Sequence, residues 1–222
     1  MTCWVWWSTG KDSAWCLHEL RGTGEQEVTG VVTTITEAFD RVSMHGVRVD
    51  VLRAQIARLD LPLHEVRIPH PCTNDVYESA VRALVGRARE SGVTAMAFGD
   101  LFLEDIRRYR ESLFDGEDIR PLFPLWGRDT LSLALEIVDS GVEAVITCLD
   151  PRVLPRELAG ASLDRDLIAR LPAGVDPCGE NGEFHTCVLD GPFFSAPVEA
   201  TKGEIVEREG FVFADLVPGA AA

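Results

Sequence analysis

The sequence has few basic residues for its size. Its 222 residues include 21 Lys and Arg against 36 Asp and Glu, a formal net charge of -15. No extended run of Lys and Arg occurs, and a nucleic-acid backbone repels so acidic a surface unless cations are concentrated locally. Nucleic acid is therefore not expected as the main partner, although an acidic balance by itself also suits any well-solvated protein.

Cysteine pairs and long apolar segments are also missing. The six cysteines are scattered without a C-x-x-C pair, which argues against zinc ribbons, iron–sulfur clusters and thioredoxin-type redox motifs. Scattered thiols in a chain of this size suggest a reducing compartment, so a cytoplasmic location is expected. No segment approaches the roughly 18 apolar residues of a membrane helix, and the apolar stretch 3–7 lacks the features of a signal peptide. No membrane association is expected.

The first 150 residues alternate short apolar runs with longer amphipathic ones. Runs rich in Val and Thr favour strands, and apolar residues at helical spacing favour helices. We predict strands over 5–7, 28–35, 63–68, 94–98 and 142–149, and helices over 13–21, 47–59, 74–90, 103–114 and 129–140. This alternation indicates an α/β fold with a doubly wound parallel sheet, which binds ligands at the carboxyl ends of its strands. The charged run 104–111 is interpreted as a solvated helix face.

The pattern changes beyond residue 150. A predicted helix over 163–171 leads into a segment containing Pro and Gly, and strand-like pieces follow at 184–189, 198–201, 205–207 and 211–213. We expect residues 151–222 to form a small mixed lobe that closes over an α/β domain comprising residues 1–150. The last residues, 217–222, are expected to form a frayed tail.

The strongest chemical signal is the turn between the first strand and the first helix, with the sequence Ser8-Thr9-Gly10-Lys11-Asp12-Ser13. A helix N-terminus offers N–H groups and a partial positive charge to an anion, and the serine hydroxyls can donate further hydrogen bonds to phosphate. Lys11 can neutralise developing charge. Phosphate would repel Asp12 unless a magnesium ion lay between them, so Asp12 is the candidate metal ligand. The alternative is an ordinary helix capped by Ser8 or Thr9.

A second polar segment lies far along the chain, with the sequence Glu180-Asn181-Gly182-Glu183-Phe184-His185-Thr186. Acidic groups beside a nucleotide can complete a magnesium shell or bind ammonium. His185 could take a proton from an attacking amine, since the ordinary pKa of histidine lies near neutrality. Taken alone, the segment is better explained as a turn followed by a strand that carries a hydrogen-bonded histidine.

Together the two segments resemble those of a known family. The first is similar to the S-G-G-x-D-S signature of the PP-loop ATP pyrophosphatases and not to a Walker A motif, with Thr9 where that family has its first glycine. The second, together with Gly99-Asp100-Leu101 and Pro124-Leu125-Trp126-Gly127, resembles segments of the diphthine–ammonia ligase family. The resemblance covers almost the whole chain.

The resemblance implies an adenine nucleotide alpha hydrolase-like fold of the HUP type. It also implies cleavage of ATP to AMP and pyrophosphate, with Mg²⁺ as cofactor, and amidation of the adenylated carboxylate by ammonium. In the family's best-known branch the carboxylate belongs to diphthine on elongation factor 2; a small-molecule acid is the alternative. No glutaminase segment is evident, so free ammonium is the expected nitrogen source.

The site residues follow from the same two segments and from the ends of the predicted strands. The predicted ATP-binding residues are Ser8, Thr9, Gly10, Lys11, Asp12, Ser13, Thr34, His45 and Gly99. The predicted catalytic residues are Lys11, Asp12, Glu180, Glu183 and His185. The predicted substrate-binding residues are Asp100, Asn181 and Thr186. Thr34 and His45 are assigned to an adenine pocket from PP-loop topology, and Asp100 because it follows a strand and a glycine.

Two rival functions account for parts of the sequence. Another PP-loop activity, such as tRNA thiolation, would be expected to use paired or catalytic cysteines and a basic surface, neither of which is evident. A nucleotide-binding sensor related to the universal stress proteins shares the α/β architecture but leaves the segment 180–186 without a role. A homodimer is the default expectation for the oligomeric state.

Overall fold

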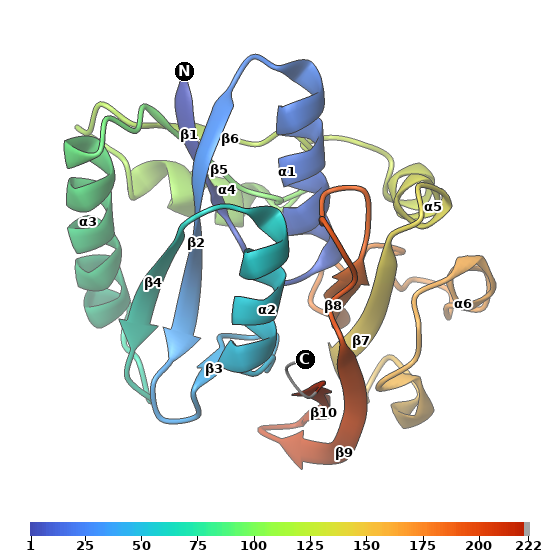
Figure 1. The fold of residues 1–222 in the computed structure, drawn as a ribbon. Helices are drawn as coiled ribbons and strands as arrows, with labels where there is room; N and C mark the ends of the chain where they lie inside the picture. Colours follow the sequence, from blue (N-terminus) through green and yellow to red (C-terminus); the bar gives the residue numbers. More distant parts are fainter. Residues whose placement is uncertain (220–222) are drawn as a thin grey trace.

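The computed structural model describes residues 1–219, and its first sheet is mostly parallel (Figure 1). Its strands are β1 (Thr2–Trp6), β2 (Glu27–Thr36), β3 (Arg41–Val42), β4 (Leu63–Ile68), β5 (Ala95–Ala97) and β6 (Arg120–Leu122). Their order is β3-β2-β1-β5-β6, with β4 also paired to β2. Among these strands the short β3 is antiparallel to β2, and the other pairs are parallel. The predicted α/β fold with a parallel sheet is therefore confirmed.

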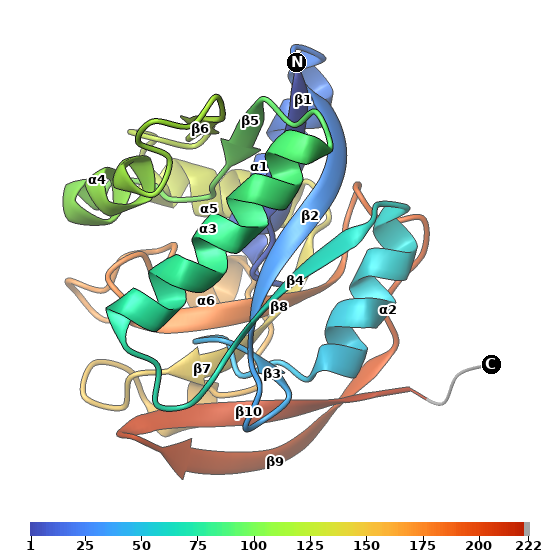
Figure 2. The ribbon, with the colours of Figure 1, turned by 90° about the vertical axis from the view of Figure 1, so that its left-hand side faces the viewer.

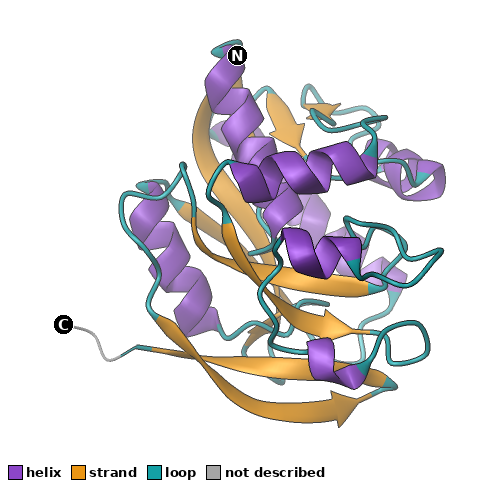
Figure 3. Cartoon of the chain, turned by 90° about the vertical axis from the view of Figure 1, so that its right-hand side faces the viewer, coloured by secondary structure: helices purple, strands orange, loops and turns teal. Residues whose placement is uncertain are grey.

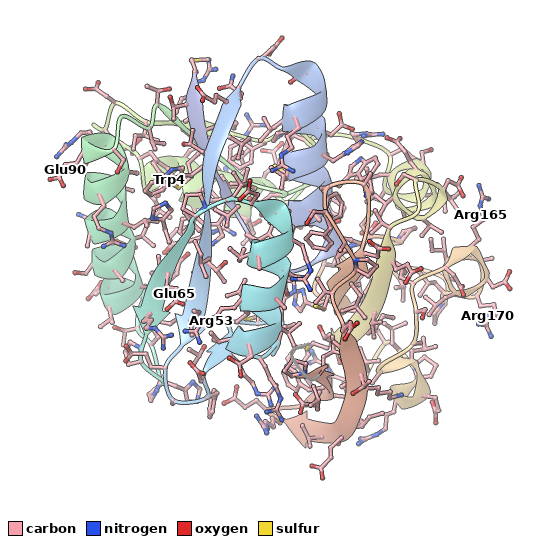
Figure 4. All side chains as sticks on the ribbon, in the orientation of Figure 1. Trp4, Arg53, Glu65, Glu90, Arg165 and Arg170 are labelled. Atoms are coloured by element: carbon pink, nitrogen blue, oxygen red, sulfur yellow. The ribbon has the colours of Figure 1, made fainter. Side chains whose placement is uncertain are left out.

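Helices cover both faces of this sheet. They are α1 (Lys11–Thr23), α2 (Val49–Leu59), α3 (Asn74–Glu90), α4 (Glu104–Ser112) and α5 (Thr130–Asp139). Successive side chains of a strand point to opposite faces. Cys3 and Val5 of β1 therefore join the core formed with α1 and α2, whereas Trp4 and Trp6 join the core formed with α3. Figures 1 and 4 show α3 and Trp4 on one side of the strands and α2 on the other, so the sheet is doubly wound as predicted.

The ends of α5 illustrate how local sequence defines these helices. The Asp129 side chain accepts a hydrogen bond from the Ser132 N–H at 2.9 Å and so caps the first turn. An uncapped N–H at this position would lack a partner within the helix. After Ser140 the chain turns away at Gly141, whose φ of 85° lies in the left-handed region that favours glycine. The predicted helix over 129–140 is confirmed to within one residue at each end.

The second sheet is antiparallel and forms the lower part of the molecule as it is drawn in Figures 2 and 3. Its strands are β7 (Glu143–Leu149), β8 (Phe184–Asp190), β9 (Ala200–Arg208) and β10 (Phe211–Pro218), in the order β8-β7-β10-β9. The short helices η1 (Arg156–Leu158) and α6 (Arg165–Ala169) connect β7 to β8. Arg165 and Arg170 project outward beside α6 (Figure 4).

Several predictions for individual strands are corrected by this sheet. The segment 142–149 was expected in the parallel sheet, but β7 pairs antiparallel with β8 and β10. A fully apolar run fits any strand that is covered on both faces, and its composition does not select its partner. The predicted pieces 198–201 and 205–207 are one edge strand, β9, whose polar middle obscured its continuity. Val217 lies in β10 and is not part of a tail, and residues 220–222 of the predicted tail lie outside the described range.

The division of the chain at residue 150 stays a prediction. Three short elements, β3, β6 and η1, were not predicted, because two or three residues carry no measurable periodicity. In the part of the chain that the structure describes, no helix combines the length and the apolar character needed to cross a bilayer.

A buried glutamine joins the two sheets. Gln55 of α2 is fully buried, and its Nε2 donates to the carbonyl oxygens of Thr9 (3.1 Å) and Val188 (2.7 Å). Its Oε1 accepts from Trp7 Nε1 at 2.8 Å. The Val188 N–H of β8 donates to the same Thr9 carbonyl at 2.9 Å. Because buried amides are stable only when their polar atoms are paired, this junction fixes β8 against the turn that follows β1.

Gln55→Leu should therefore lower the free energy of unfolding by about 2–3 kcal/mol, since it leaves the Trp7 N–H without a partner and weakens the junction. Urea denaturation followed by tryptophan fluorescence measures this change. Gln26→Leu is the matched control, because the Gln26 Oε1 has no hydrogen-bond partner among residues 1–219. Equal stability of the two variants would contradict the role of Gln55.

Candidate active site

A cavity of about 650 Å³ opens between the carboxyl edge of the parallel sheet and the second sheet. One side is formed by residues within two positions of the ends of β1, β2, β4 and β5, namely Trp6, Thr34, Ile68 and Phe98. Doubly wound sheets bind their ligands at this edge. The two segments singled out from the sequence meet here. They contribute Ser8, Lys11, Asp12 and Ser13 on one side and Glu180, Asn181, Gly182, Phe184, His185 and Thr186 on the other.

The turn 8–13 is held by its own serine hydroxyls. Ser13 Oγ accepts from the Ser8 N–H (3.2 Å) and donates to the Gly10 carbonyl (2.9 Å), and Ser8 Oγ donates to Ser13 Oγ (3.1 Å). The N-cap of α1 is Gly10, without a hydrogen bond from a capping side chain, so the alternative of a helix capped by Ser8 or Thr9 is wrong. The hydroxyls that were predicted to bind phosphate here hold the shape of the turn, and their contact with phosphate stays a prediction.

Thr9 adopts the backbone conformation that glycine would favour. Its φ is 75°, in the left-handed region where a side chain adds strain. The residue is fully buried, and its carbonyl oxygen accepts the hydrogen bonds of the junction with Gln55 and Val188. Such strain persists only where the surroundings determine the conformation. The junction therefore lets threonine occupy a position where the PP-loop signature has glycine.

Two glycines allow close approaches around this turn. A Cβ on Gly10 would lie 2.9 Å from His45 Cε1 and 3.0 Å from the Thr186 carbonyl oxygen. A Cβ on Gly99 would lie 2.8 Å from the main-chain carbonyl of Asp12. The predicted assignment of Gly99 to the site thus acquires a physical reason, because only glycine lets the segment after β5 lie against the first turn of α1.

Lys11 is a buried cation beside a carboxylate. Its side chain is 2% exposed, and its Nζ lies 2.9 Å from Asp12 Oδ2 and also donates to the Cys178 carbonyl. Burial opposes its charge, but Asp12, Cys178 and Glu180 together outweigh this effect and raise the pKa of Lys11. Burial raises the pKa of Asp12, although Lys11 acts against it. Lys11 is therefore positively charged at neutral pH.

Asp12 also has an oxygen available for a ligand. Its Oδ1 is buried and has no hydrogen-bond partner among the described residues. Residues 1–219 contain no group of three His, Cys, Asp or Glu side chains that could hold a metal by themselves. Magnesium is commonly held by one or two carboxylates together with substrate phosphates and water. The free Oδ1 fits that kind of site.

The segment 180–186 is tied directly to the turn. Thr186 Oγ1 accepts from the Lys11 N–H at 3.1 Å, and the Thr186 carbonyl oxygen lies 3.1 Å from His45 Nδ1, a contact that requires the proton on Nδ1. The rings of His45 and His185 lie 4.6 Å apart. Burial, followed by the charge of His185, holds the pKa of His45 well below its usual value. Thr186 and His45 thus shape the wall beside the turn.

The pKa of His185 differs from the value assumed from the sequence. Burial, followed by the positive charge of Lys11, lowers its pKa to about 4. The imidazole is therefore neutral at pH 7 and a weaker base than an exposed histidine. The expectation of a histidine that titrates near neutrality is wrong for this site.

Glu180 is instead the cavity group that titrates near neutrality. Burial raises its pKa to about 7, the charges of Asp12 and Asp100 add to this effect, and hydrogen bonds from the Leu101 and Phe102 N–H groups partly offset it. The bond from Leu101 to Glu180 Oε1 is 2.7 Å long. A carboxylate with a pKa near the working pH is suited to accept and return protons.

Arg110 is a cavity residue that sequence reasoning missed. Its Nε lies 3.3 Å from Asp100 Oδ2, and its guanidinium lies 4.8 Å from the centre of the Phe98 ring. It belongs to the run 104–111, which was interpreted as a solvated face; none of the α4 residues is fully buried, yet Arg110 lines the cavity. The sequence did carry a signal for this position, because residues three and four apart share a helix face. Arg110 has this spacing from Ile106 and Leu103, and all three line the cavity.

Not every predicted residue faces this cavity. Thr34, His45, Gly99, Asp100 and Asn181 line it, whereas Thr9, Gly10 and Glu183 do not. Thr34 Oγ1 is buried without a partner among the described residues and is thus available to a ligand. Glu183 Oε1 accepts from the Asp176 N–H (2.9 Å) and from Asn181 Nδ2 (3.0 Å), so Glu183 stabilises the bend formed by residues 176–183. Its predicted catalytic role is untested.

This fold and site define a class of protein. The sheet is doubly wound and parallel, and its first strand leads through a serine-rich turn into a helix. The turn faces a cavity at the carboxyl edge of the sheet. This is the arrangement of the PP-loop, HUP-type α/β proteins. Sequence comparison then supplies the family. The model of the diphthamide synthase N-terminal domain matches residues 1–118, and that of the C-terminal domain matches residues 129–215. The chain belongs to the diphthamide synthase family.

Similar proteins bear the name diphthine–ammonia ligase. One from Schizosaccharomyces pombe is 28% identical over 224 residues, which cover 90% of this chain and 36% of that protein. One from Bos taurus is 29% identical over 151 residues, covering 65% of this chain and 56% of that protein. One from Mus musculus is 24% identical over 239 residues, covering 87% of this chain and 85% of that protein. The chain thus spans less than two thirds of the first two relatives.

The close approach at Gly99 leads to a stability prediction. Gly99→Ala should lower the free energy of unfolding by about 1–3 kcal/mol, because the new methyl group overlaps the Asp12 main chain. Gly86→Ala in α3 is the matched control. A Cβ at Gly86 meets nothing within 4 Å, so alanine should add about 0.5–1 kcal/mol of stability there. Chemical denaturation of both variants measures these changes, and a Gly99→Ala protein as stable as the wild type would contradict the predicted overlap.

Proposed function

We propose that this chain is an ATP-dependent ligase that adenylates a carboxylate, releases pyrophosphate and forms an amide with ammonium. The observation that carries the proposal is the single cavity that joins the turn 8–13 to the segment 180–186 in a member of the diphthamide synthase family. The names of the relatives support the use of ammonia as the nitrogen donor. The particular acceptor, diphthine on elongation factor 2 or a small-molecule acid, is part of the proposal.

In this proposal the phosphates of ATP lie at the N-terminus of α1. Lys11, which is charged and buried, neutralises the pyrophosphate as it departs, and the start of the helix favours the same charge. Asp12 Oδ1 would hold a magnesium ion, which when bound supplies further neutralisation of the phosphates. Thr34 and His45, on the β2 side of the cavity, are assigned to the adenine end.

The chemistry requires two successive steps. The acceptor carboxylate attacks the α-phosphorus of ATP, and the bond to pyrophosphate breaks to leave an acyl adenylate. Ammonium loses one proton to give ammonia, which attacks the acyl carbon; the bond to AMP then breaks, and the new amide nitrogen releases a second proton. Glu180 is the group suited to take that proton, since its pKa is about 7 and that of His185 is about 4. Strand β8 of the second sheet forms one wall of the cavity, and in this proposal it limits the access of competing water.

The charges on the acceptor side suit a carboxylate substrate. Arg110 lines the cavity, where its guanidinium pairs with Asp100 and lies over the Phe98 ring. A guanidinium recognises carboxylates with paired hydrogen bonds. We assign Asp100, Asn181 and Thr186, together with Arg110, to the acceptor side.

Cys178 is not suited to a sulfur-transfer reaction. Cys178 lines the cavity, but burial raises its pKa to about 12. Sulfur transfer needs a thiolate, and a thiol with this pKa stays protonated at neutral pH. The expected homodimer and cytoplasmic location stay predictions of the same proposal.

The Asp12 carboxylate gives the direct test of turnover. Asp12→Asn should lower pyrophosphate release from ATP by at least about a hundredfold, because it removes the negative charge that binds magnesium. Chromatography of labelled ATP, incubated with ammonium and candidate acids, separates AMP from ADP. Asp139→Asn, at an exposed ion pair with Arg165, is the matched control and should keep the wild-type rate. Formation of ADP, or binding of ATP without any turnover as in a sensor, would overturn the proposal.

The raised pKa of Glu180 predicts a pH dependence. Below about pH 7 its carboxyl group is protonated and cannot accept a proton, so the rate should rise with pH around a midpoint near 7. Glu180→Gln should remove this rise and leave a slower, flatter profile. The measurement is kcat/KM for ammonium between pH 5.5 and about 8.5. An unchanged midpoint in Glu180→Gln would assign the titration to another group.

A further inference from the structure

A second cavity lies beside the proposed active site and shares a wall with it. Its volume is about 490 Å³, and Asn181 and Gly182 line both cavities. The other lining residues are Asp150 and Val153, which follow β7, the loop 172–175, and Glu183. The bend that was predicted to carry chemistry therefore separates two cavities.

Glu183 lines this second cavity and has one carboxylate oxygen without a hydrogen-bond partner among the described residues. The residue is 7% exposed, and its Oε1 is occupied by the N–H of Asp176 and by Asn181 Nδ2. Its Oε2 is buried and has no hydrogen-bond partner among residues 1–219. A buried carboxylate is costly unless a donor or a cation satisfies it. A bound cation would supply the missing partner.

The charge balance around Glu183 indicates the charge of that cation. Asp150 is the other acidic residue of the cavity, and Arg152 neutralises it with bonds of 2.9 Å from Nε and 2.6 Å from Nη2. Glu183 is thus the carboxylate that lacks a compensating cation among the described residues that line this cavity. One negative charge matches a monovalent ion.

The remaining walls make a divalent metal unsuitable. Val153, Pro172, Ala173 and Val175 contribute apolar side chains. The described residues also provide no group of three His, Cys, Asp or Glu side chains for a metal. A divalent ion needs several oxygen ligands and more negative charge. A small monovalent cation that donates hydrogen bonds needs fewer.

We propose that the second cavity binds ammonium, with Glu183 Oε2 accepting one of its N–H bonds, and holds the nitrogen donor next to the active site. The inference rests on the proposed function, because an amide ligase that uses free ammonium needs a place to bind it. Potassium carries the same charge and is the alternative occupant of this site. The site gives Glu183 a second role besides the two hydrogen bonds that hold the bend.

Thallium(I), a monovalent cation visible by its anomalous scattering, tests the site directly. Crystals of the full chain soaked in thallium acetate should show an anomalous peak in the second cavity, in contact with Glu183 Oε2. Glu183→Gln should abolish the peak, although its amide oxygen can still accept from Asp176 and Asn181. Glu204→Gln, an exposed glutamate of β9, is the matched control that keeps the peak.

Competition then separates ammonium from potassium. Ammonium should displace thallium at a lower concentration than potassium does. In turnover assays, Glu183→Gln should raise the ammonium concentration for half-maximal rate by about tenfold or more, and leave that for ATP unchanged, because a hydrogen bond to a charged group is lost.

The outcomes distinguish the inference from the proposed function. No peak in the wild type, a peak that persists in Glu183→Gln, or displacement by potassium before ammonium would each overturn the ammonium site. The proposed function fails separately, if wild-type protein releases no pyrophosphate from ATP. The thallium result does not depend on that assay.

Discussion

The contact between β8 and the turn after β1 is the constraint on which the rest of the site depends. The Thr9 carbonyl accepts from Val188 and Gln55, and Thr186 accepts from the Lys11 N–H two residues further along the turn. The bonds of Val188 to Thr9 and of Lys11 to Thr186 join residues that lie at least 175 positions apart in the chain. They hold Thr9 in a left-handed conformation and bring the segment 180–186 against the start of α1. Without them, the cavity would have only one wall.

Burial at this contact also sets the charges of the site. Lys11 keeps its charge because Asp12 lies beside it, whereas His45 and His185 are neutral because burial and the positive Lys11 both oppose protonation. The same low-dielectric surroundings raise the pKa of Glu180 to about 7. One buried layer thus supplies a fixed cation for phosphate and a carboxylate that can exchange a proton near neutral pH. The sequence shows all of these residues but not their environments.

Much of the fold could be predicted because its signals are local. The helices α3 and α5 and the strand β4 follow from the apolar spacing within each segment, and α5 also from its capping residue Asp129. The pairing partner of each strand was harder to predict, as β7 shows. An apolar strand is compatible with either sheet. Its place depends on β8 and β10, which come later in the chain. Arg110 was missed for a related reason. A charged residue on a polar helix is normally solvated, and only the position of α4 beside Asp100 turns it toward the cavity.

The sequence by itself determined the α/β class, the turn Ser8 to Ser13 and the late acidic segment, because each depends on neighbours within a few residues of the chain. Only the tertiary structure decided which cavity each residue of the late segment lines. Glu180, His185 and Thr186 line the first cavity, whereas Glu183 lines the second. Side chains alternate along a strand and turn abruptly at a bend, so residues a few positions apart can reach different environments. Burial, and with it each pKa, exists only once distant segments pack together.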